Sequence, residues 1–389
     1  MKIIGMISGT SYDGIDTACC DFSLENKKLT ITVLAFESYP YPEDVYNKIS
    51  QAMPPKSITM EDVCILDTRI GQEFAAAASK ISRENDFSAD LVVSHGQTLF
   101  HWIDENLKAQ GTLQLGEPAW ISQATGLPTL SNLRARDVAA GGQGAPLVSI
   151  LDQLLLGSSE VPVGALNLGG ISNITVTGKS LQPLAYDIGP ANGLMDAAMT
   201  AFTKGESTFD KEGATARSGE IQEEILSAML KHPYYAMPWP KSTGKEIFHL
   251  PYIIENFGPI ETWNLPNVMA TLTELTSETV ARDVEAHKLS TLYIAGGGSD
   301  NPYLVERMRM RLKNCEVLPI SHIGIDPRQK EAIAFALLGY LSLHGLAGSL
   351  PACTGASSPQ ILGSFTPGAK PLVMPPPLSE YPETLSILS

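Results

Sequence analysis

The strongest constraint on the fold of this chain is an order of elements that occurs twice. Residues 2–7, 15–22 and 29–36 are rich in Ile, Val, Leu and Thr and are separated by polar turns, so they predict three consecutive strands. A helical pattern follows over residues 61–85, and ADLVVSHGQT then predicts a further strand. The second half repeats this order in VGALNLGGISNITVTG, PLAYDIGP, ANGLMDAAMTAF and STLYIAGGGSD. The sequence therefore predicts an internally duplicated α/β fold.

The length of 389 residues also favours two domains, because one hydrophobic core rarely grows beyond about 250–300 residues. We place the first domain over residues 1–128, joined by the C-terminal segment 340–389, and the second over residues 129–339. Two such halves are expected to face each other across a cleft, where small ligands tend to bind. The segment from Ser349 onward is rich in Pro, Gly and Ser, which predicts an extended surface segment or a frayed tail.

The composition excludes several kinds of partner. With 43% hydrophobic and 18% charged residues the chain is typical of a globular protein. A net charge of −15 argues against binding to nucleic acid or anionic lipid, although backbone N–H groups and a metal ion can still hold a phosphorylated ligand. The five cysteines form no C-x-x-C pattern, and neither a signal peptide nor a long apolar stretch is evident. We expect a cytoplasmic protein without nucleic-acid or membrane partners, and we leave a homodimer open.

Two hairpin tips are the first candidate binding features. The tip SGTSYDG combines glycines with hydroxyl and carboxylate groups, at Gly9, Thr10, Ser11, Asp13 and Gly14. Its N–H groups could bind an oxyanion, and its carboxylate could hold a divalent cation. GGISN places Gly169 and Gly170 at the corresponding tip of the second half. Either tip alone could be an ordinary turn, but their matching positions predict that both contact one phosphorylated ligand.

Two further glycine-rich turns follow predicted strands. In YDIGPANG, Asp187 ends a strand just before Gly189, where an acid is well placed as a general base, although such aspartates also cap turns. IAGGGSDNP is not a dinucleotide-binding fingerprint, because Asn301 replaces the third glycine. Its strand-to-helix turn could still carry a base or ribose, on Gly296, Gly297 and Gly298. KSTGKE is not a P-loop, because Glu246 follows Lys245 and no glycine lies five residues before Gly244.

Candidate substrate contacts lie in three other stretches. NLRARDVAAGGQGAP joins Arg134 and Asp137 to a glycine loop, which suits recognition of a carboxylate or phosphate but also suits an ordinary salt-bridged loop. His95 lies at a predicted strand end in SHGQT. Glu331 lies in the early turns of a predicted helix, where it could accept hydrogen bonds from sugar hydroxyls or only complement the helix dipole.

Eight motifs together resemble those of the anhydro-N-acetylmuramic acid kinases, in family order and over nearly the whole chain. They are GMISGTSYDGID, SHGQT, LRARDVAAGGQGAPL, NLGGISNIT, YDIGPANGLMDA, KSTGKE, YIAGGGSDNP and EAIAFALLG. The chain departs from the family pattern at Tyr12, where a methionine is expected, and at Ala191, where a glycine is expected. The family belongs to the superfamily of acetate kinase, sugar kinases, Hsp70 and actin. The resemblance thus implies two actin-like, ribonuclease H-like domains around a central nucleotide cleft.

The resemblance also implies a reaction and roles for residues. ATP, with Mg²⁺, phosphorylates O6 of 1,6-anhydro-N-acetylmuramic acid while water opens the anhydro bridge at C1, in cell-wall recycling. Asp187 matches the general base, and Asp13 would be a metal ligand. The resemblance implies that Arg134 and Glu331 contact the sugar and that His95 and Asp137 lie near it. It implies that the glycine turns bind the nucleotide, through Gly9, Thr10, Ser11, Asp13, Gly14, Gly169, Gly170, Gly189, Gly296, Gly297 and Gly298.

Two alternatives stay open at the level of sequence. Another amino-sugar kinase of the same superfamily would use Asp187 to deprotonate a sugar hydroxyl instead of water. A nucleotide-switched binding protein of the actin or Hsp70 kind would hydrolyse ATP slowly without any sugar. Comparing the intact anhydro sugar with its opened form as phosphoryl acceptor separates the two kinases.

Overall fold

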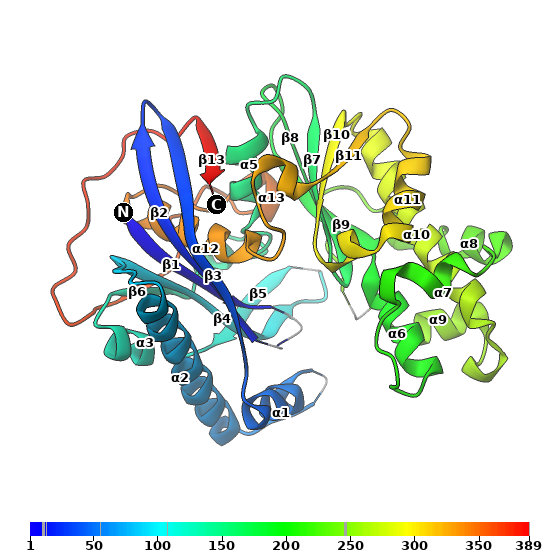
Figure 1. Cartoon of the computed structure of the whole chain (residues 1–389), viewed down its shortest axis with the longest axis horizontal. Coiled ribbons are helices and arrows are strands. Elements are labelled where there is room, and N and C mark those ends of the chain that lie inside the picture. Colours follow the sequence, from blue (N-terminus) through cyan, green and yellow to red (C-terminus); the bar gives the residue numbers. More distant parts are fainter. Residues whose placement is uncertain (10–11, 13, 55, 107, 245–246, 389) are drawn as a thin grey trace. The chain divides into compact units, whose positions relative to one another are not determined.

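The chain forms two compact units, each described here by itself. The computed structural model describes residues 1–9, 12, 14–54, 56–106, 108–244 and 247–388. Unit 1 comprises Met1–Leu155 and Ile323–Ser389, and unit 2 comprises Leu156–His322 (Figure 1). The expected boundaries after residue 128 and before residue 340 therefore differ from those of the structure. Residues 129–155 and 323–339 belong to unit 1, because a strand and a helix within them pack into its sheet.

Unit 1 is built on a mixed sheet with the strand order β12-β6-β4-β1-β2-β3-β13, and β5 pairs with β4 off this path. The first three strands form an antiparallel meander, and β4 and β6 continue from β1 in parallel. Their bounds are β1 Lys2–Ser8, β2 Gly14–Glu25, β3 Lys28–Pro40, β4 Leu91–Ile103, β5 Ala109–Leu115, β6 Thr129–Ser131, β12 Ser364–Thr366 and β13 Thr384–Leu388.

Alternating side chains of β1 explain how helices cover both faces of this sheet. Ile4 and Met6 lie in one apolar cluster with residues of α1 and α2. Gly5 points the other way, where a Cβ atom would collide with the backbone of Ala332 in α12, so only glycine permits this close approach. The helices of unit 1 are α1 Glu43–Ala52, α2 Met60–Glu84, α3 Pro118–Thr125, α4 Ala135–Ala139, α5 Ser149–Leu156, α12 Lys330–Leu343 and α13 Pro351–Thr354.

Unit 2 has a five-stranded sheet with the order β11-β10-β7-β8-β9. Again three strands form an antiparallel meander, and two more continue in parallel from the first. The bounds are β7 Val163–Leu168, β8 Ile171–Thr177, β9 Leu184–Pro190, β10 Thr291–Ala295 and β11 Glu316–Pro319.

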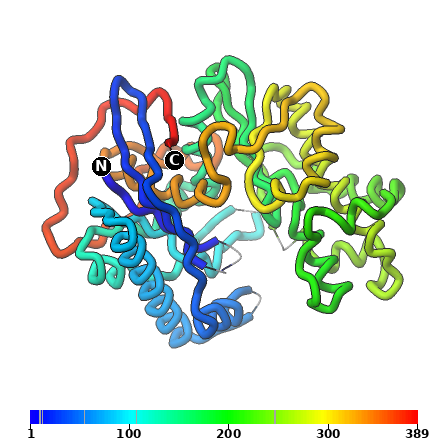
Figure 2. The backbone as a smooth tube through the Cα atoms, viewed as in Figure 1, coloured from blue at the N-terminus to red at the C-terminus, as the bar shows by residue number. Residues whose placement is uncertain are grey.

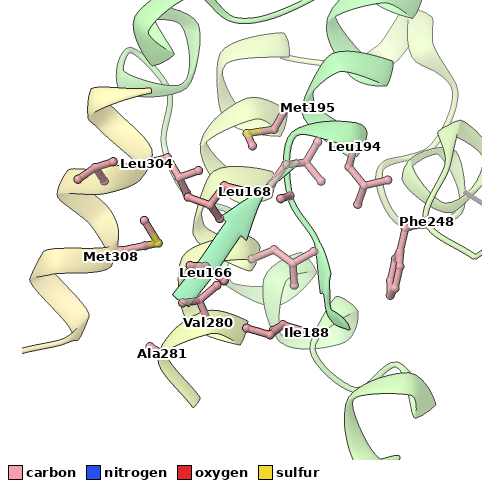
Figure 3. Packing of buried hydrophobic residues seen from close by; sticks show 14 of the residues in the cluster. Leu166, Leu168, Ile188, Leu194, Met195, Phe248, Val280, Ala281, Leu304 and Met308 are labelled. Carbon is pink, nitrogen blue, oxygen red and sulfur yellow. The ribbon is translucent and has the colours of Figure 1, made fainter. Parts of the chain in front are cut away.

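The apolar core of unit 2 is formed by residues of its sheet, such as those of β7 and β9, and of the helices packed on it (Figure 3). Leu166 and Leu168 of β7 pack in one cluster with residues such as Val280 of α10 and Leu304 of α11. The helices of unit 2 are α6 Asn192–Phe202, α7 Ala214–Arg217, α8 Glu223–Met229, α9 Leu250–Phe257, α10 Leu265–Ala286 and α11 Pro302–Arg311, with short 3₁₀ turns η1 Lys211–Gly213, η2 Pro233–Ala236, η3 Ile260–Thr262, η4 Gly297–Asp300 and η5 Ile320–Ile323.

The two sheets confirm the predicted duplication. The path β3-β2-β1-β4-β6 of unit 1 and the path β9-β8-β7-β10-β11 of unit 2 have the same order and the same strand directions. The α/β class predicted from the sequence is thus confirmed. Among the residues that the structure describes, no helix combines the length and hydropathy that crossing a bilayer requires.

The C-terminal segment differs from the expected extended or frayed tail at its end. Strand β13 pairs in parallel with β3, in a register that runs from Thr384 opposite Lys28 to Leu388 opposite Thr32. Figure 2 shows the red end of the chain lying beside the blue N-terminal hairpin. The apolar Leu385 and Ile387 alternate with polar residues and are both buried, which is the pattern that lets so short a segment join a sheet.

Candidate functional site

The hairpin tip of unit 1 is anchored to the neighbouring strand by a polar contact. Ser8, at the end of β1, donates its hydroxyl to Gln97 Oε1 of β4 at 2.5 Å. The Gln97 Nε2 group donates to the Gly9 carbonyl at 3.2 Å, and the Tyr12 amide donates to the same oxygen at 3.1 Å. Gly14 opens β2, where a Cβ atom would lie 2.6 Å from the carbonyl oxygen of Tyr39. The predicted Thr10, Ser11 and Asp13 lie outside the described residues.

His95 and Arg134, predicted from separate motifs, are hydrogen-bonded in unit 1. Arg134 Nε donates to His95 Nε2 at 2.8 Å, and one terminal nitrogen of the guanidinium donates to the Gly144 carbonyl at 2.7 Å. A guanidinium only donates, so His95 Nε2 accepts and Nδ1 carries the proton toward the Gly96 carbonyl at 3.0 Å. Burial and the nearby Arg134 charge lower the pKa of His95 well below its ordinary value. The imidazole is therefore neutral, in one tautomer.

Arg134 is itself held in a largely desolvated position. Burial lowers the pKa of its guanidinium to about 10, against the opposing effect of Glu331 and Asp137, so it stays charged at neutral pH. Glu331 lies in the first turn of α12. Desolvation by the surrounding protein raises the pKa of the Glu331 carboxyl, and Arg134 opposes that rise. Arg134 is thus hydrogen-bonded to the neutral His95 and interacts electrostatically with Glu331.

Asp137 organises the loop that carries Arg134. Its side chain is fully buried, and its carboxylate accepts from the Gly144 amide at 2.8 Å and from the Thr354 hydroxyl at 2.8 Å. Gly142 packs so closely on this carboxylate that any Cβ atom there would collide with it. These bonds fold residues 134–144 back on themselves and fix the start of α4.

Asp187 of unit 2 is bracketed by the segment 234–243, some 50 residues further along the chain. Its carboxylate oxygen Oδ2 accepts from the Ser242 hydroxyl at 2.7 Å and from the Thr243 amide at 3.0 Å. Its backbone amide donates to the Lys241 carbonyl at 2.9 Å, and its carbonyl accepts from the Tyr234 hydroxyl at 2.5 Å. Both the backbone and the carboxylate of Asp187 are therefore held by one segment.

The position of Asp187 within its strand differs from the prediction. The sequence predicts that the strand ends at Asp187, but β9 continues to Pro190. Gly189 and Pro190 pair with Ser172 and Ile171 of β8, because a bulge between Ser172 and Asn173 lets the ladder resume. Gly189 is consequently a strand residue, and a Cβ atom there would lie 2.9 Å from the Tyr235 ring.

The predicted nucleotide glycines of unit 2 gather at one end of its sheet. Gly169 and Gly170 connect β7 to β8, and their carbonyls accept from the amides of Ala191, Asn192 and Gly193 at 3.0 Å. Gly296 follows β10 with φ +81°, and a Cβ atom there would lie 2.5 Å from Asn167 Oδ1 of β7. Asn192 also donates from Nδ2 to the Leu168 carbonyl at 3.1 Å, beside Gly297 and Gly298. The hairpin tip, the η4 turn and the N-terminus of α6 thus lie together.

A metal site is not built from the described side chains. Within the described part of the chain, no group of three or more His, Cys, Asp or Glu side chains is arranged to hold an ion. The predicted ligand Asp13 lies outside these residues. A nucleotide-borne Mg²⁺ needs only one or two protein carboxylates beside its phosphates and waters, so the donor set expected of a dedicated site is not required.

Four polar residues of these sites escaped the sequence analysis. Gln97 lies inside the SHGQT motif and Asn192 inside YDIGPANG, so their motifs mark them although their partners do not follow from sequence. Ser242 and Thr243 lie in KSTGKE, which is correctly not a P-loop. KSTGKE is one of the eight motifs of the resemblance, but it has no helix or strand periodicity that would identify the partner of its hydroxyl residues.

Comparison with known proteins gives consistent matches over the whole chain. The family model described as anhydro-N-acetylmuramic acid kinase matches residues 1–368. A protein of Streptomyces coelicolor with the same name is 46% identical over 389 residues, covering 100% of this chain and 99% of the relative. A protein of Rhodococcus erythropolis, also so named, is 44% identical over 395 residues, covering 100% and 99%.

Among solved structures the likeness is weaker. A ROK family glucokinase from Streptomyces griseus, in complex with glucose and AMPPNP, shares 13% identity and a TM-score of 0.39, covering 87% of this chain and 99% of that chain. A likeness of this size bears on neither the fold nor the ligand of the present chain.

Proposed function

The chain belongs to the anhydro-N-acetylmuramic acid kinase family, and from this premise we propose that it transfers the γ-phosphoryl group of ATP to O6 of 1,6-anhydro-N-acetylmuramic acid. Water attacks C1, the C1–O6 bond breaks, and O6 attacks the γ-phosphorus while ADP leaves. The product is N-acetylmuramic acid 6-phosphate, in recycling of the cell wall. The single observation that carries the proposal is the family match over residues 1–368.

Asp187 is the proposed general base. It takes the proton of the attacking water as the C1–O bond forms. The bonds from Ser242 and Thr243 support this role, because they hold its carboxylate in one orientation on the sheet edge of unit 2. General-base assistance of this kind is typically worth about 10²–10⁴ in rate.

The nucleotide is assigned to glycine turns. In unit 2 the Gly169-Gly170 tip and the Gly296–Gly298 turn are proposed to contact the phosphates, because glycine lets a ligand approach the backbone closely. They lie beside the positive end of α6, whose first amides donate to the Gly169 and Gly170 carbonyls. In unit 1 the tip from Gly9 to Gly14 is proposed as a second phosphate contact. Mg²⁺ would neutralise the phosphate charge when bound, and no step assigned to the protein depends on its placement.

We assign binding of the sugar to Arg134 and Glu331 of unit 1. Arg134 is charged and its guanidinium is oriented by His95 and Gly144, so its fork suits a substrate carboxylate or hydroxyl. Glu331 can accept hydrogen bonds from sugar hydroxyls. Asp137 contributes by folding the loop of Arg134. A cytoplasmic location, with only ATP and the sugar as partners, belongs to the same proposal.

Isotope labelling in water tests this function. The protein is incubated with ATP, Mg²⁺ and the 1,6-anhydro sugar in ¹⁸O-labelled water, and the product is analysed by mass spectrometry. We expect the label at C1 and none in the transferred phosphate. N-acetylmuramic acid with its free 6-hydroxyl serves as a second acceptor: its preferential phosphorylation favours the other amino-sugar kinase, and sugar-independent ATP hydrolysis favours the nucleotide switch.

A further inference from the structure

The edge of the unit 2 sheet is closed in an unusual way at Asp187. Strand β9 is the last strand of the sheet order, so its outer backbone groups need partners that no strand supplies. The Asp187 amide donates a hydrogen bond to the Lys241 carbonyl, and the Tyr234 hydroxyl donates one to the Asp187 carbonyl. The segment 234–243 therefore replaces an edge strand at this one residue. It also supplies two hydrogen-bond donors to the Asp187 side chain, from Ser242 and Thr243.

We infer that Ser242 and Thr243 are positioning residues for Asp187, and this inference rests on the proposed function. The Ser242 hydroxyl and the Thr243 amide both donate to the same oxygen, Oδ2, at 2.7 and 3.0 Å. Two donors on one oxygen fix the plane of the carboxylate, which is what a base needs for one productive direction of attack. They also favour the charged form of the carboxylate, which is the form that accepts a proton.

The segment that carries these donors is itself anchored. Lys241 is buried, and its Nζ donates to the carbonyls of Tyr234 and Tyr235 at 3.3 Å while lying 4.7 Å from the centre of the Tyr234 ring. Trp239 stacks on Tyr186, the residue before Asp187, with ring centres 5.6 Å apart. Trp239 and Lys241 thus hold the stretch that leads directly into the clamp, by which we mean the contact of Ser242 and Thr243 with the Asp187 carboxylate.

Among the residues that the structure describes, several charged and titratable groups lie around the clamp. Tyr234 approaches from η2 and Lys241 from the segment itself. The Tyr186 hydroxyl of β9 is hydrogen-bonded to His287 Nε2 at 2.9 Å. Asp283 of α10 interacts electrostatically with both Lys241 and Tyr186. Burial lowers the pKa of Lys241 and Asp283 opposes that shift. Substitution of Ser242 leaves all of these groups in place.

Removing the Ser242 hydroxyl should therefore weaken catalysis without affecting nucleotide binding. We expect Ser242→Ala to lower kcat about tenfold, the cost of one hydrogen bond to a charged group, and to move the acid limb of the pH–rate profile to higher pH. The KM for ATP should stay within about twofold, because the clamp involves none of the nucleotide glycines. Ser242→Thr keeps a hydroxyl and should recover most of the rate.

The test uses the full-length protein and steady-state kinetics from pH 5 to 9 for wild type, Ser242→Ala, Ser242→Thr and the control Ser218→Ala. Ser218 is an exposed serine of unit 2 whose hydroxyl bonds to the Thr215 carbonyl. Circular dichroism and thermal midpoints check the fold, and Ser242→Cys, with its weak donor, replaces the alanine variant if that does not fold. A wild-type pH profile and rate in Ser242→Ala would overturn the inference. An inactive wild-type protein would instead overturn the proposed function.

Discussion

The two units share one strand order but close the edge after the third strand differently. In unit 1 the outer edge of β3 is covered from Lys28 to Thr32 by β13, in a regular parallel ladder. In unit 2 the edge strand β9 meets the irregular segment 234–243 at Asp187. A regular ladder leaves no backbone donor for a side chain, whereas the irregular segment provides Ser242 and Thr243. The difference teaches that the two copies of a duplicated fold can diverge at a sheet edge, where loop contacts in one copy bring donors to a side chain of the strand.

The hairpin tips differ in the same sense. The tip of unit 2 is only the pair Gly169-Gly170, and its carbonyls are bonded to the start of α6. The tip of unit 1 spans the residues between Ser8 and Gly14 and is tied to β4 through Gln97. The shorter tip joins two elements of its own unit, and the longer one has room for additional polar groups.

The largest expected effect is on turnover, and it distinguishes Asp187 of β9 from the corresponding residue of β3. Asp187→Asn keeps the shape of the side chain but removes the base, so we expect turnover of the anhydro sugar to fall by about 10²-fold or more. Binding of ATP, measured by calorimetry, should remain within a few-fold of wild type. Glu37→Gln is the matched control, because Glu37 also precedes the end of its strand by three residues and is exposed on β3. Retention of more than about a tenth of wild-type kcat in Asp187→Asn would contradict the base assignment.

The next effect is on stability, and it compares Gly96 of β4 with Gly296, which follows the corresponding strand β10 of unit 2. Gly96 and Gly296 have φ values of +75° and +81°, and a Cβ atom on either would lie 2.5 Å from an oxygen. We expect alanine at each to lower the free energy of unfolding by about 2 kcal/mol, from backbone strain and contact. Urea unfolding measures this. Gly297→Ala is the control, because its Cβ atom would only touch Asn192 Nδ2 at 3.7 Å. Equal losses in all three variants would show that neither φ nor the contact sets the cost.

The smallest effect concerns the pH dependence of stability. The pKa of His95 is lowered well below 6.5 by burial and by Arg134. The unfolded chain then binds more protons than the folded one below pH 6.5, so the free energy of unfolding must fall as the pH falls. We expect His95→Gln to reduce that fall between pH 6.5 and 5.5 by about 1 kcal/mol. His322→Gln in unit 2 is the control, and an unchanged slope in His95→Gln would mean that this imidazole is protonated in the folded protein.

Sequence patterns could predict the duplicated core because it depends on local periodicity. Apolar runs and turns gave the two meanders, and the motif YDIGPANG marked Asp187 before its surroundings were known. The unit boundaries depend on partners far apart in sequence: β6 is only three residues long and pairs with β4 and β12. The motif KSTGKE marked Ser242 and Thr243, but their partner could not be predicted, because their hydrogen bonds to Asp187 of β9 join residues far apart in the sequence.

The return of the chain to unit 1 after residue 322 has a consequence for biosynthesis. Strands β1 to β4 leave the ribosome before α12 and β13, yet α12 covers one face of their sheet and β13 extends its edge beside β3. Unit 2 contains all of its sheet and helices once residue 322 has emerged. Since domains generally fold as units during synthesis, the half of the molecule that is made first should be the half that matures last, with its N-terminal strands dependent on a late segment or on chaperones until then.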